Sequence, residues 1–144
     1  MKKILFAFTL ILLVASCNED SNSQVHYFQV GVKNAPTEWR DSSFIVATSD
    51  PVIIKEAEEQ LKLPIDKRKM LTGALERGSG NYNKNATHEF KWHFKENEWR
   101  FADVTTEVCD GRPYSDVDLN LSYWVDTVTR FCPWSSYISK RLNK

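Results

Sequence analysis

The segment from Glu107 to Trp134 constrains the fold of this chain most, because it contains two of the three cysteines, Cys109 and Cys132. The two cysteines are too far apart in the sequence to form the CxxC pattern of redox or zinc sites. They can form a disulfide, act as reactive thiols or bind a metal. The cellular compartment decides between these fates, because disulfides persist only where the surroundings are oxidising.

The N-terminus predicts export from the cytoplasm. Lys2 and Lys3 precede an uncharged apolar run at residues 4–14, which is too short to span a bilayer and is typical of a secretory signal. The run ends in Val-Ala-Ser-Cys at residues 14–17, which resembles a bacterial lipobox. We therefore predict a signal peptide at residues 1–16 and lipidation of Cys17. The alternative is an ordinary signal peptide in which Cys17 is incidental.

Residues 17–24 are polar after the cysteine and predict a solvated tether between the lipid and the folded part. The acidic residues Glu19 and Asp20 resemble the surface-export signal of lipoproteins in the Bacteroidetes group. Aspartate directly after the lipidated cysteine is the enterobacterial signal for retention in the inner membrane, and here that position is Asn18. We expect attachment to the outer membrane or the cell surface, with the lipid on Cys17 as the contact with the membrane.

The charge of the mature chain argues against nucleic acid as a partner. Lys and Arg together number 19, as do Asp and Glu. Removal of Lys2 and Lys3 with the signal leaves 17 basic residues and a net charge of 17 − 19 = −2. A weakly acidic protein lacks the positive field that holds nucleic acid or an anionic membrane surface. The length of residues 25–144 suits a single domain.

In an oxidising envelope, and with Cys17 carrying lipid, Cys109 and Cys132 remain as a pair. We predict a disulfide between them. Closing a loop of this length contributes ~3 kcal/mol to stability in the chain-entropy model.

Local patterns predict an α+β fold. Residues 25–32, 43–48 and 70–77 have strand-like composition, and Gly73 in the third run indicates a bulge or a close approach of another segment. Asp50 and Pro51 are typical of a helix start. Helices are also expected from Ser115 and, as a short last element, after Pro133. We expect a small antiparallel sheet of about five strands, one helix after strand two, two short C-terminal helices and one disulfide.

Residues 88–104 have the clearest alternation and predict an antiparallel hairpin that turns at residues 95–98. The alternation places five aromatic rings on one face, namely Phe90, Trp92, Phe94, Trp99 and Phe101. In so small a domain we expect this face to be core. The alternative is a sugar-binding platform, which joint exposure of Trp39, Trp92 and Trp134 would favour.

Three residues of the cysteine segment are candidates for a site: Glu107, Asp110 and Trp134. The two acids could bind a cation or act as acid and base with a histidine. In the alternative interpretation they are structural: Asp110 accepts hydrogen bonds from backbone N–H groups in a turn, and Glu107 pairs with Arg112.

The familiar catalytic and metal motifs are absent from the sequence. Residues 116–127 begin like a calcium-binding EF-hand loop, but Leu121 and Thr127 occupy the positions that require glycine and glutamate. His88 and His93 differ in strand parity and are expected on opposite faces. We therefore predict no metal site, no cofactor and no catalytic residue.

The sequences Glu-Val-Cys-Asp-Gly at residues 107–111 and Phe-Cys-Pro-Trp-Ser-Ser at residues 131–136, with Trp124 between them, resemble a known family. It is the N-terminal domain of a slime-mould calmodulin-binding protein, which also occurs alone in bacterial secreted proteins. The resemblance implies a fold but no established activity. Calmodulin is not an expected partner of a bacterial envelope protein.

Three functions are compatible with these observations. The preferred hypothesis is a non-enzymatic recognition module on a lipid anchor, binding an extracytoplasmic protein, for instance an inhibited protease, or a glycan. The second is a small hydrolase or metal-dependent enzyme that uses Glu107, Asp110 and a histidine. The third is a structural envelope lipoprotein without a specific ligand.

Overall fold

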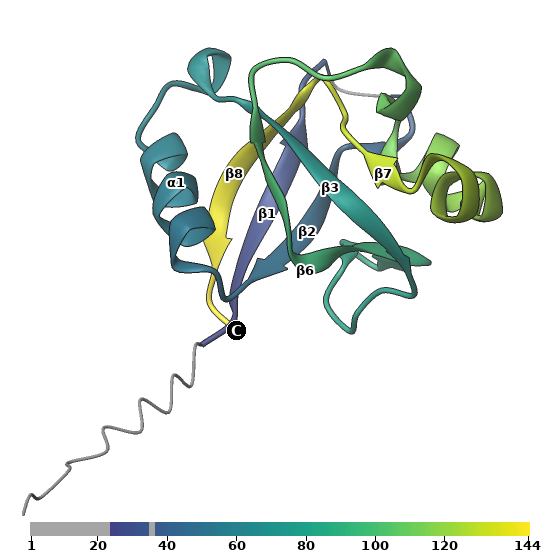
Figure 1. The fold of residues 1–144 in the computed structure, drawn as a ribbon, viewed down its shortest axis with the longest axis horizontal. Coiled ribbons are helices and arrows are strands. Elements are labelled where there is room, and N and C mark those ends of the chain that lie inside the picture. Colours follow the sequence, from purple (N-terminus) through teal and green to yellow (C-terminus); the bar gives the residue numbers. More distant parts are fainter. Residues whose placement is uncertain (1–23, 35–36) are drawn as a thin grey trace, which may run out of the picture.

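The computed structural model describes residues 24–34 and 37–144 and has an α+β fold of three small antiparallel sheets (Figure 1). The predicted signal peptide, Cys17 and the predicted tether up to residue 23 lie outside the described residues. The first sheet has the order β2-β1-β8, with bounds Ser43–Thr48, His26–Val32 and Ser136–Leu142. The second has the order β6-β3-β7, with bounds Trp92–Ala102, Met70–Arg77 and Arg130–Phe131. A two-stranded sheet pairs β4 (Lys84–Asn85) with β5 (His88–Glu89).

The strands predicted at residues 25–32, 43–48 and 70–77 are confirmed as β1, β2 and β3. All residues of β2 are buried, as its nearly continuous apolar sequence requires of a strand covered on both faces. β1 pairs with β2 in an antiparallel register that places Phe28 opposite Val46 and Val30 opposite Phe44. These four apolar side chains contribute the first sheet's share of the core.

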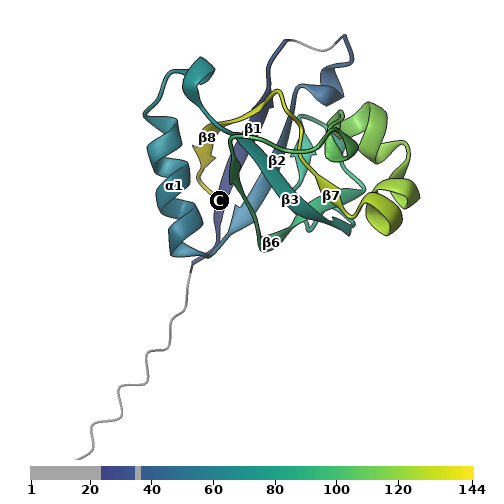
Figure 2. The same ribbon diagram turned by 45° about the horizontal axis from the view of Figure 1, so that its top comes forward.

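The predicted first helix is also confirmed, as α1 (Pro51–Leu61). A side-chain oxygen of Asp50 accepts a hydrogen bond from the Val52 N–H at 2.8 Å, so the helix start has the expected cap. Ile53 and Ala57 are buried, and α1 packs beside β8 (Figures 1 and 2). Within residues 24–34 and 37–144, no helix is long and apolar enough to cross a bilayer.

The core lies between the two larger sheets and is rich in aromatic rings. Phe44 of β2 is in contact with Trp92, Phe94 and Phe131 of the second sheet at centroid distances of 5.4, 5.6 and 5.9 Å. All five rings of the alternating segment are at most 7% exposed, so the core interpretation is confirmed. The joint exposure of three tryptophans is wrong, because Trp92 is fully buried.

The predicted hairpin at residues 88–104 is wrong, although its aromatic face is right. Residues 92–102 form one strand, β6, which pairs with β3 rather than with itself. Phe94 lies opposite Leu75 and Trp99 opposite Gly73, so residues 95–98 bulge out of the ladder. Asn97 has a φ of 64°, and its Oδ1 accepts from the Ser49 N–H at 2.8 Å. The turn signal at residues 95–98 therefore reflects a real local bend that serves a long-range contact.

The short last helix predicted after Pro133 is also wrong. This segment forms β8, which pairs with the free edge of β1. Ile138 lies opposite Val30, and both are fully buried. The spacing of Tyr137, Ile138 and Leu142 suits one turn of a helix, but a short apolar run does not distinguish helix from strand. The open edge of β1, which lies far away in the sequence, decides for the strand.

The helix expected from Ser115 is replaced by two short π-helical segments, η4 (Pro113–Asp118) and η5 (Tyr123–Val128). Ser115 lies inside η4, and Arg112 holds the N-cap position instead. The predicted apolar face is right: Val117 and Trp124 are buried, and Leu121 and Val125 pack against the core. The remaining short turns are the 3-10 segments η1 (Trp39–Asp41), η2 (Ile65–Lys67) and η3 (Glu107–Cys109).

Gly73 occupies a position where no side chain fits. The pairing of β3 with β6 shifts register directly after it, as its presence in a strand predicted. A Cβ at this position would lie 2.5 Å from the ring of Phe94, which is fully buried and cannot move aside. Gly73→Ala is therefore expected to lower the free energy of unfolding by about 1–3 kcal/mol through overpacking. Urea denaturation will measure it, with Gly78→Ala, which meets no neighbouring atom, separating overpacking from backbone effects.

Candidate functional site

The predicted disulfide between Cys109 and Cys132 is confirmed, with a Cα–Cα distance of 5.2 Å. Both cysteines are buried, and the Cys132 N–H donates to the Cys109 carbonyl at 2.8 Å. The bond joins the loop after β6 to the loop between β7 and β8. We call residues 104–110 and 132–135, the two loops around this disulfide, the stapled tip.

Asp110 and Trp134, two of the predicted site residues, meet within the stapled tip. Asp110 Oδ1 accepts a hydrogen bond from the backbone N–H of Trp134 at 2.9 Å. Glu107 begins the 3-10 turn η3, and its carbonyl accepts from the Asp110 N–H at 3.1 Å. The Glu107 side chain is exposed, and within the described residues it forms no ion pair with Arg112. The disulfide and the Asp110 carboxylate together hold both loops in one conformation.

The stapled tip exposes large apolar side chains. Val104 is 83% exposed, Val108 is 69% exposed and Trp134 is 43% exposed. Single exposed apolar residues are ordinary on protein surfaces, but here three of them lie on two loops that a covalent bond connects. Aliphatic and indole surface is thus presented to solvent on a rigid base.

The stapled tip lies at the end of the domain opposite the N-terminal tether (Figure 1). β1 begins at His26, directly after the tether, and ends at Val32, which pairs with Ser136. The Lys33 N–H then donates to the Ser135 carbonyl in the tip at 2.8 Å. Seven extended residues at about 3.3 Å each separate the two ends by about 20 Å. The tip therefore lies at the far end of β1 from the segment that leads to the predicted lipid.

The histidines contact groups other than Glu107 and Asp110. His88 Nε2 lies 3.2 Å from the buried carboxylate of Asp118, and His93 Nε2 lies 3.4 Å from Glu76. His26 contacts Arg141. In the described part of the chain, no three His, Cys, Asp or Glu side chains are grouped so that they could hold a metal ion. The acid–histidine contact that the enzyme hypothesis invokes is not formed among these residues.

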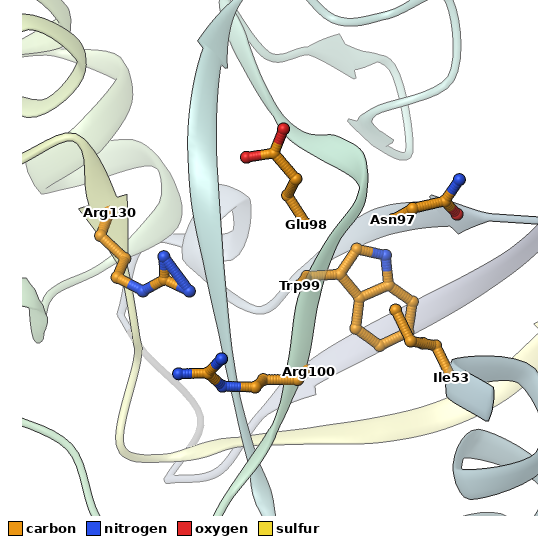
Figure 3. A pocket seen from close by; sticks show the side chains of 6 residues that line it. All are labelled: Ile53, Asn97, Glu98, Trp99, Arg100 and Arg130. Atoms are coloured by element: carbon orange, nitrogen blue, oxygen red, sulfur yellow. The ribbon is translucent and has the colours of Figure 1, made fainter. Parts of the chain in front are cut away.

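A second feature is an open hollow of about 370 Å³ on the outer face of the second sheet, lined by Ile53, Asn97, Glu98, Trp99, Arg100 and Arg130 (Figure 3). Trp99 points into the core and donates from Nε1 to the Ala47 carbonyl at 2.7 Å. Figure 3 shows the side chains of Arg100 and Arg130 extending toward each other from β6 and β7. We call this feature the arginine hollow.

Sequence reasoning missed the buried carboxylate of Asp41. Its Oδ1 accepts from the N–H groups of Tyr114 and Ser115 at 2.7 and 2.9 Å, and its Oδ2 accepts from the Ser115 hydroxyl at 2.5 Å. Asp41 thereby caps the first turn of η4, a role that the sequence suggested for Ser115. The partners lie more than seventy residues away, so no local pattern could reveal the contact.

Two neighbouring groups have shifted pKa values. The Arg40 side chain and backbone N–H donate hydrogen bonds to the Glu38 carboxylate and lower the pKa of Glu38 to about 2. The Arg40 guanidinium also lies 3.6 Å above the ring of Tyr114, so it ties η1 to η4. On another face of the domain, burial raises the pKa of Tyr82, whose hydroxyl donates to the Phe94 carbonyl. Neither group lies in the stapled tip or lines the arginine hollow.

Comparison with protein families gives two matches. Residues 1–18 match the prokaryotic membrane lipoprotein lipid attachment site, as the sequence around Cys17 predicts. The protein is thus a prokaryotic lipoprotein, anchored by lipid in the cell envelope. No curated protein and no solved structure is similar enough to the chain to count as a match. Residues 24–144 match the family that the cysteine segment resembles, so the chain belongs to the N-terminal domain family of the slime-mould calmodulin-binding protein.

Proposed function

We propose that this lipoprotein is a non-enzymatic recognition module that binds an extracytoplasmic partner through the stapled tip. The observation that carries the proposal is the exposure of Val104, Val108 and Trp134 on two disulfide-linked loops at the far end of β1 from the anchor. Binding residues concentrate on loops that a rigid scaffold positions. The tip meets both conditions, since it is built of loops and is held by a covalent bond.

The chemistry of the tip favours a protein over a glycan as the partner. A tryptophan can stack on a sugar ring, but Val104 and Val108 offer only aliphatic surface. Aliphatic surface gains free energy when another apolar surface removes it from water, by roughly 25 cal/mol for each Å² buried. Trp134 is of the residue type that most often dominates binding energy at protein interfaces. We therefore assign the tip to a protein partner and treat glycan binding as the alternative outcome.

The position of the anchor fits the same function. Asn18, Glu19 and Asp20 after Cys17 support attachment at the outer membrane or the cell surface. A polar segment between the lipid and β1 would let the domain turn freely, while the length of β1 keeps the tip away from the bilayer. A partner in solution or on a neighbouring surface could then reach the tip without contacting lipid.

Affinity capture with tip variants will test this function. Full-length tagged protein in intact cells of the producing bacterium is expected to capture a specific partner, and Trp134→Ala and Val108→Ser are each expected to reduce that capture at least about tenfold, as loss of an interface hot spot does. Surface labelling of the same cells will show whether the domain faces outward.

Val52→Ser is the matched control. Val52 is 72% exposed, close to the 69% of Val108, but it lies in the first turn of α1, next to the end of β2 that pairs with His26. Its substitution is expected to leave capture unchanged. Equal capture by all three variants would place the binding surface elsewhere. A protein that captures nothing and lies wholly in the periplasm would instead support a structural lipoprotein, and capture of polysaccharide alone would support the glycan alternative.

A further inference from the structure

The outer face of the second sheet places two arginines on either side of the central strand β3. Arg100 of β6 lies opposite Thr72, and Arg130 of β7 lies opposite Ala74. Thr72 and Ala74 are two residues apart, so both arginines project from the same face of the sheet. Strands about 4.8 Å apart put the two backbones about 10 Å from each other, within reach of two arginine side chains. Figure 3 shows the side chains converging over β3.

Other arginines of the domain are engaged by partners that neutralise or saturate them. Arg40 pairs with Glu38 at 2.8 Å, Arg77 with Asp126 at 2.6 Å and Arg141 with Glu58 at 2.7 Å. Arg68 donates to three backbone carbonyls. Within the described residues, Arg100 and Arg130 have no carboxylate at ion-pair distance, although they share one hollow. Two like charges that converge without a counterion make a site that favours an anion.

One of the two guanidinium groups is oriented by the fold. Arg130 Nε donates to Thr72 Oγ1 at 3.2 Å, and Thr72 is only 5% exposed. This hydrogen bond fixes the side chain of Arg130 and leaves the terminal nitrogens for a ligand. Arginine presents these nitrogens as a planar fork, which matches the two oxygens of a carboxylate or phosphate.

The remaining lining of the hollow selects among anions. Glu98 is exposed and lies two residues before Arg100 on the same strand, and its carboxylate opposes a doubly charged ligand. Phosphate carries more negative charge at neutral pH than a carboxylate does. Glu98 can also accept a hydrogen bond from a hydroxyl or N–H group beside the bound anion. The hollow thus favours a singly charged carboxylate that has a donor group nearby.

We infer that the arginine hollow is a binding site for a carboxylate-bearing ligand, in which Arg100 and Arg130 hold the carboxylate and Glu98 accepts from a neighbouring donor. Two sources share this chemistry: an acidic sugar, with hydroxyl donors, and a peptide C-terminus, with an N–H donor. The site lies outside the stapled tip and is independent of the function proposed for the tip.

Isothermal titration calorimetry on the full-length lipidated protein in detergent micelles will test the site. The probes are glucuronate, the dipeptide alanyl-alanine and inorganic phosphate. We expect at least one of the two carboxylates to bind more tightly than phosphate. Arg100→Gln and Arg130→Gln are each expected to raise its Kd about tenfold, as loss of one charge-assisted hydrogen bond does. Arg100→Lys, which keeps the charge but not the fork, is expected to have a smaller effect.

Control variants separate the site from general charge and from folding. Arg112→Gln removes an exposed arginine that does not line the hollow, and Trp134→Ala alters the stapled tip; both are expected to leave the Kd unchanged. Glu98→Gln is expected to improve phosphate binding relative to carboxylate. Arg100 is exposed, so its substitution is expected to leave the thermal unfolding midpoint unchanged and gives a result even if Arg130→Gln does not fold.

The outcomes decide clearly. Binding of glucuronate alone identifies an acidic sugar, and binding of the dipeptide alone identifies a peptide carboxyl group. Tighter binding of phosphate than of either carboxylate overturns the assignment. So does unchanged carboxylate binding by Arg100→Gln, or the lack of any heat change with both carboxylates at about 10 mM, a concentration far above the Kd of a specific small-molecule site.

Discussion

Trp99→Ala is expected to lower the free energy of unfolding by about 3–5 kcal/mol, the usual cost of deleting a buried indole. Trp99 is 1% exposed and packs against Phe28 and Phe101 at centroid distances of 6.5 and 5.8 Å. Its Nε1 donates to the Ala47 carbonyl, which loses this partner in the variant. Urea denaturation followed by circular dichroism will measure the change.

Trp39→Ala is the matched control, because Trp39 is 49% exposed and contributes no side chain to the core. Its substitution is expected to change stability by no more than about 0.5 kcal/mol, as for most surface positions. Trp99→Phe should fall between the two, since it keeps a ring but loses the hydrogen bond. A loss below about 1 kcal/mol for Trp99→Ala, at the level of mild core changes, would contradict the packing described for β6.

Loss of the disulfide has the second large expected effect. The double variant Cys109→Ser/Cys132→Ser is expected to lose ~3 kcal/mol of stability, because the open chain regains the entropy that closure of this loop removes from the unfolded state. The cysteines are 23 positions apart in the sequence. Thermal unfolding of the wild-type protein with and without a reducing agent should show a corresponding drop in the midpoint temperature.

The double variant is its own control, since reductant should not change its unfolding temperature. Equal unfolding temperatures of the wild-type protein under oxidising and reducing conditions would show that the bond is absent. Because the disulfide also joins the two loops of the stapled tip, its loss is expected to weaken partner capture even below the unfolding temperature.

The elements with local signals could be predicted from the sequence. α1 carries its own cap at Asp50 and a proline in its first turn, and β2 is apolar along its whole length. The aromatic face of β6 follows from alternation alone. The predicted disulfide depended on compartment and on cysteine parity, and both are visible in the sequence.

The elements that depend on distant partners could not be predicted. β8 forms because the edge of β1 is open, and the turn at residues 95–98 becomes a bulge because β3, not the second half of β6, supplies the pairing. The helical segment η4 takes its cap from Asp41, far away in the sequence. In each case tertiary contact outweighs a short local pattern.

The candidate sites follow the same division. Asp110 and Trp134 were named from the sequence, because they flank the two cysteines. The exposure of Val104 and Val108 depends on how the loops fold over the disulfide, so composition could not indicate it. Arg100 and Arg130 are thirty residues apart, and only their pairing with opposite sides of β3 brings them to one hollow.

Site-specific photo-crosslinking in living cells tests recognition at the stapled tip most directly. A photoreactive amino acid is placed at Val108 in the tip and, as its matched control, at Val52 near the tether; these residues are 69% and 72% exposed. The same defined partner should be crosslinked from position 108 and not from position 52. Equal crosslinking from both positions, or none from position 108 with intact folded protein on the membrane, would contradict recognition through the tip.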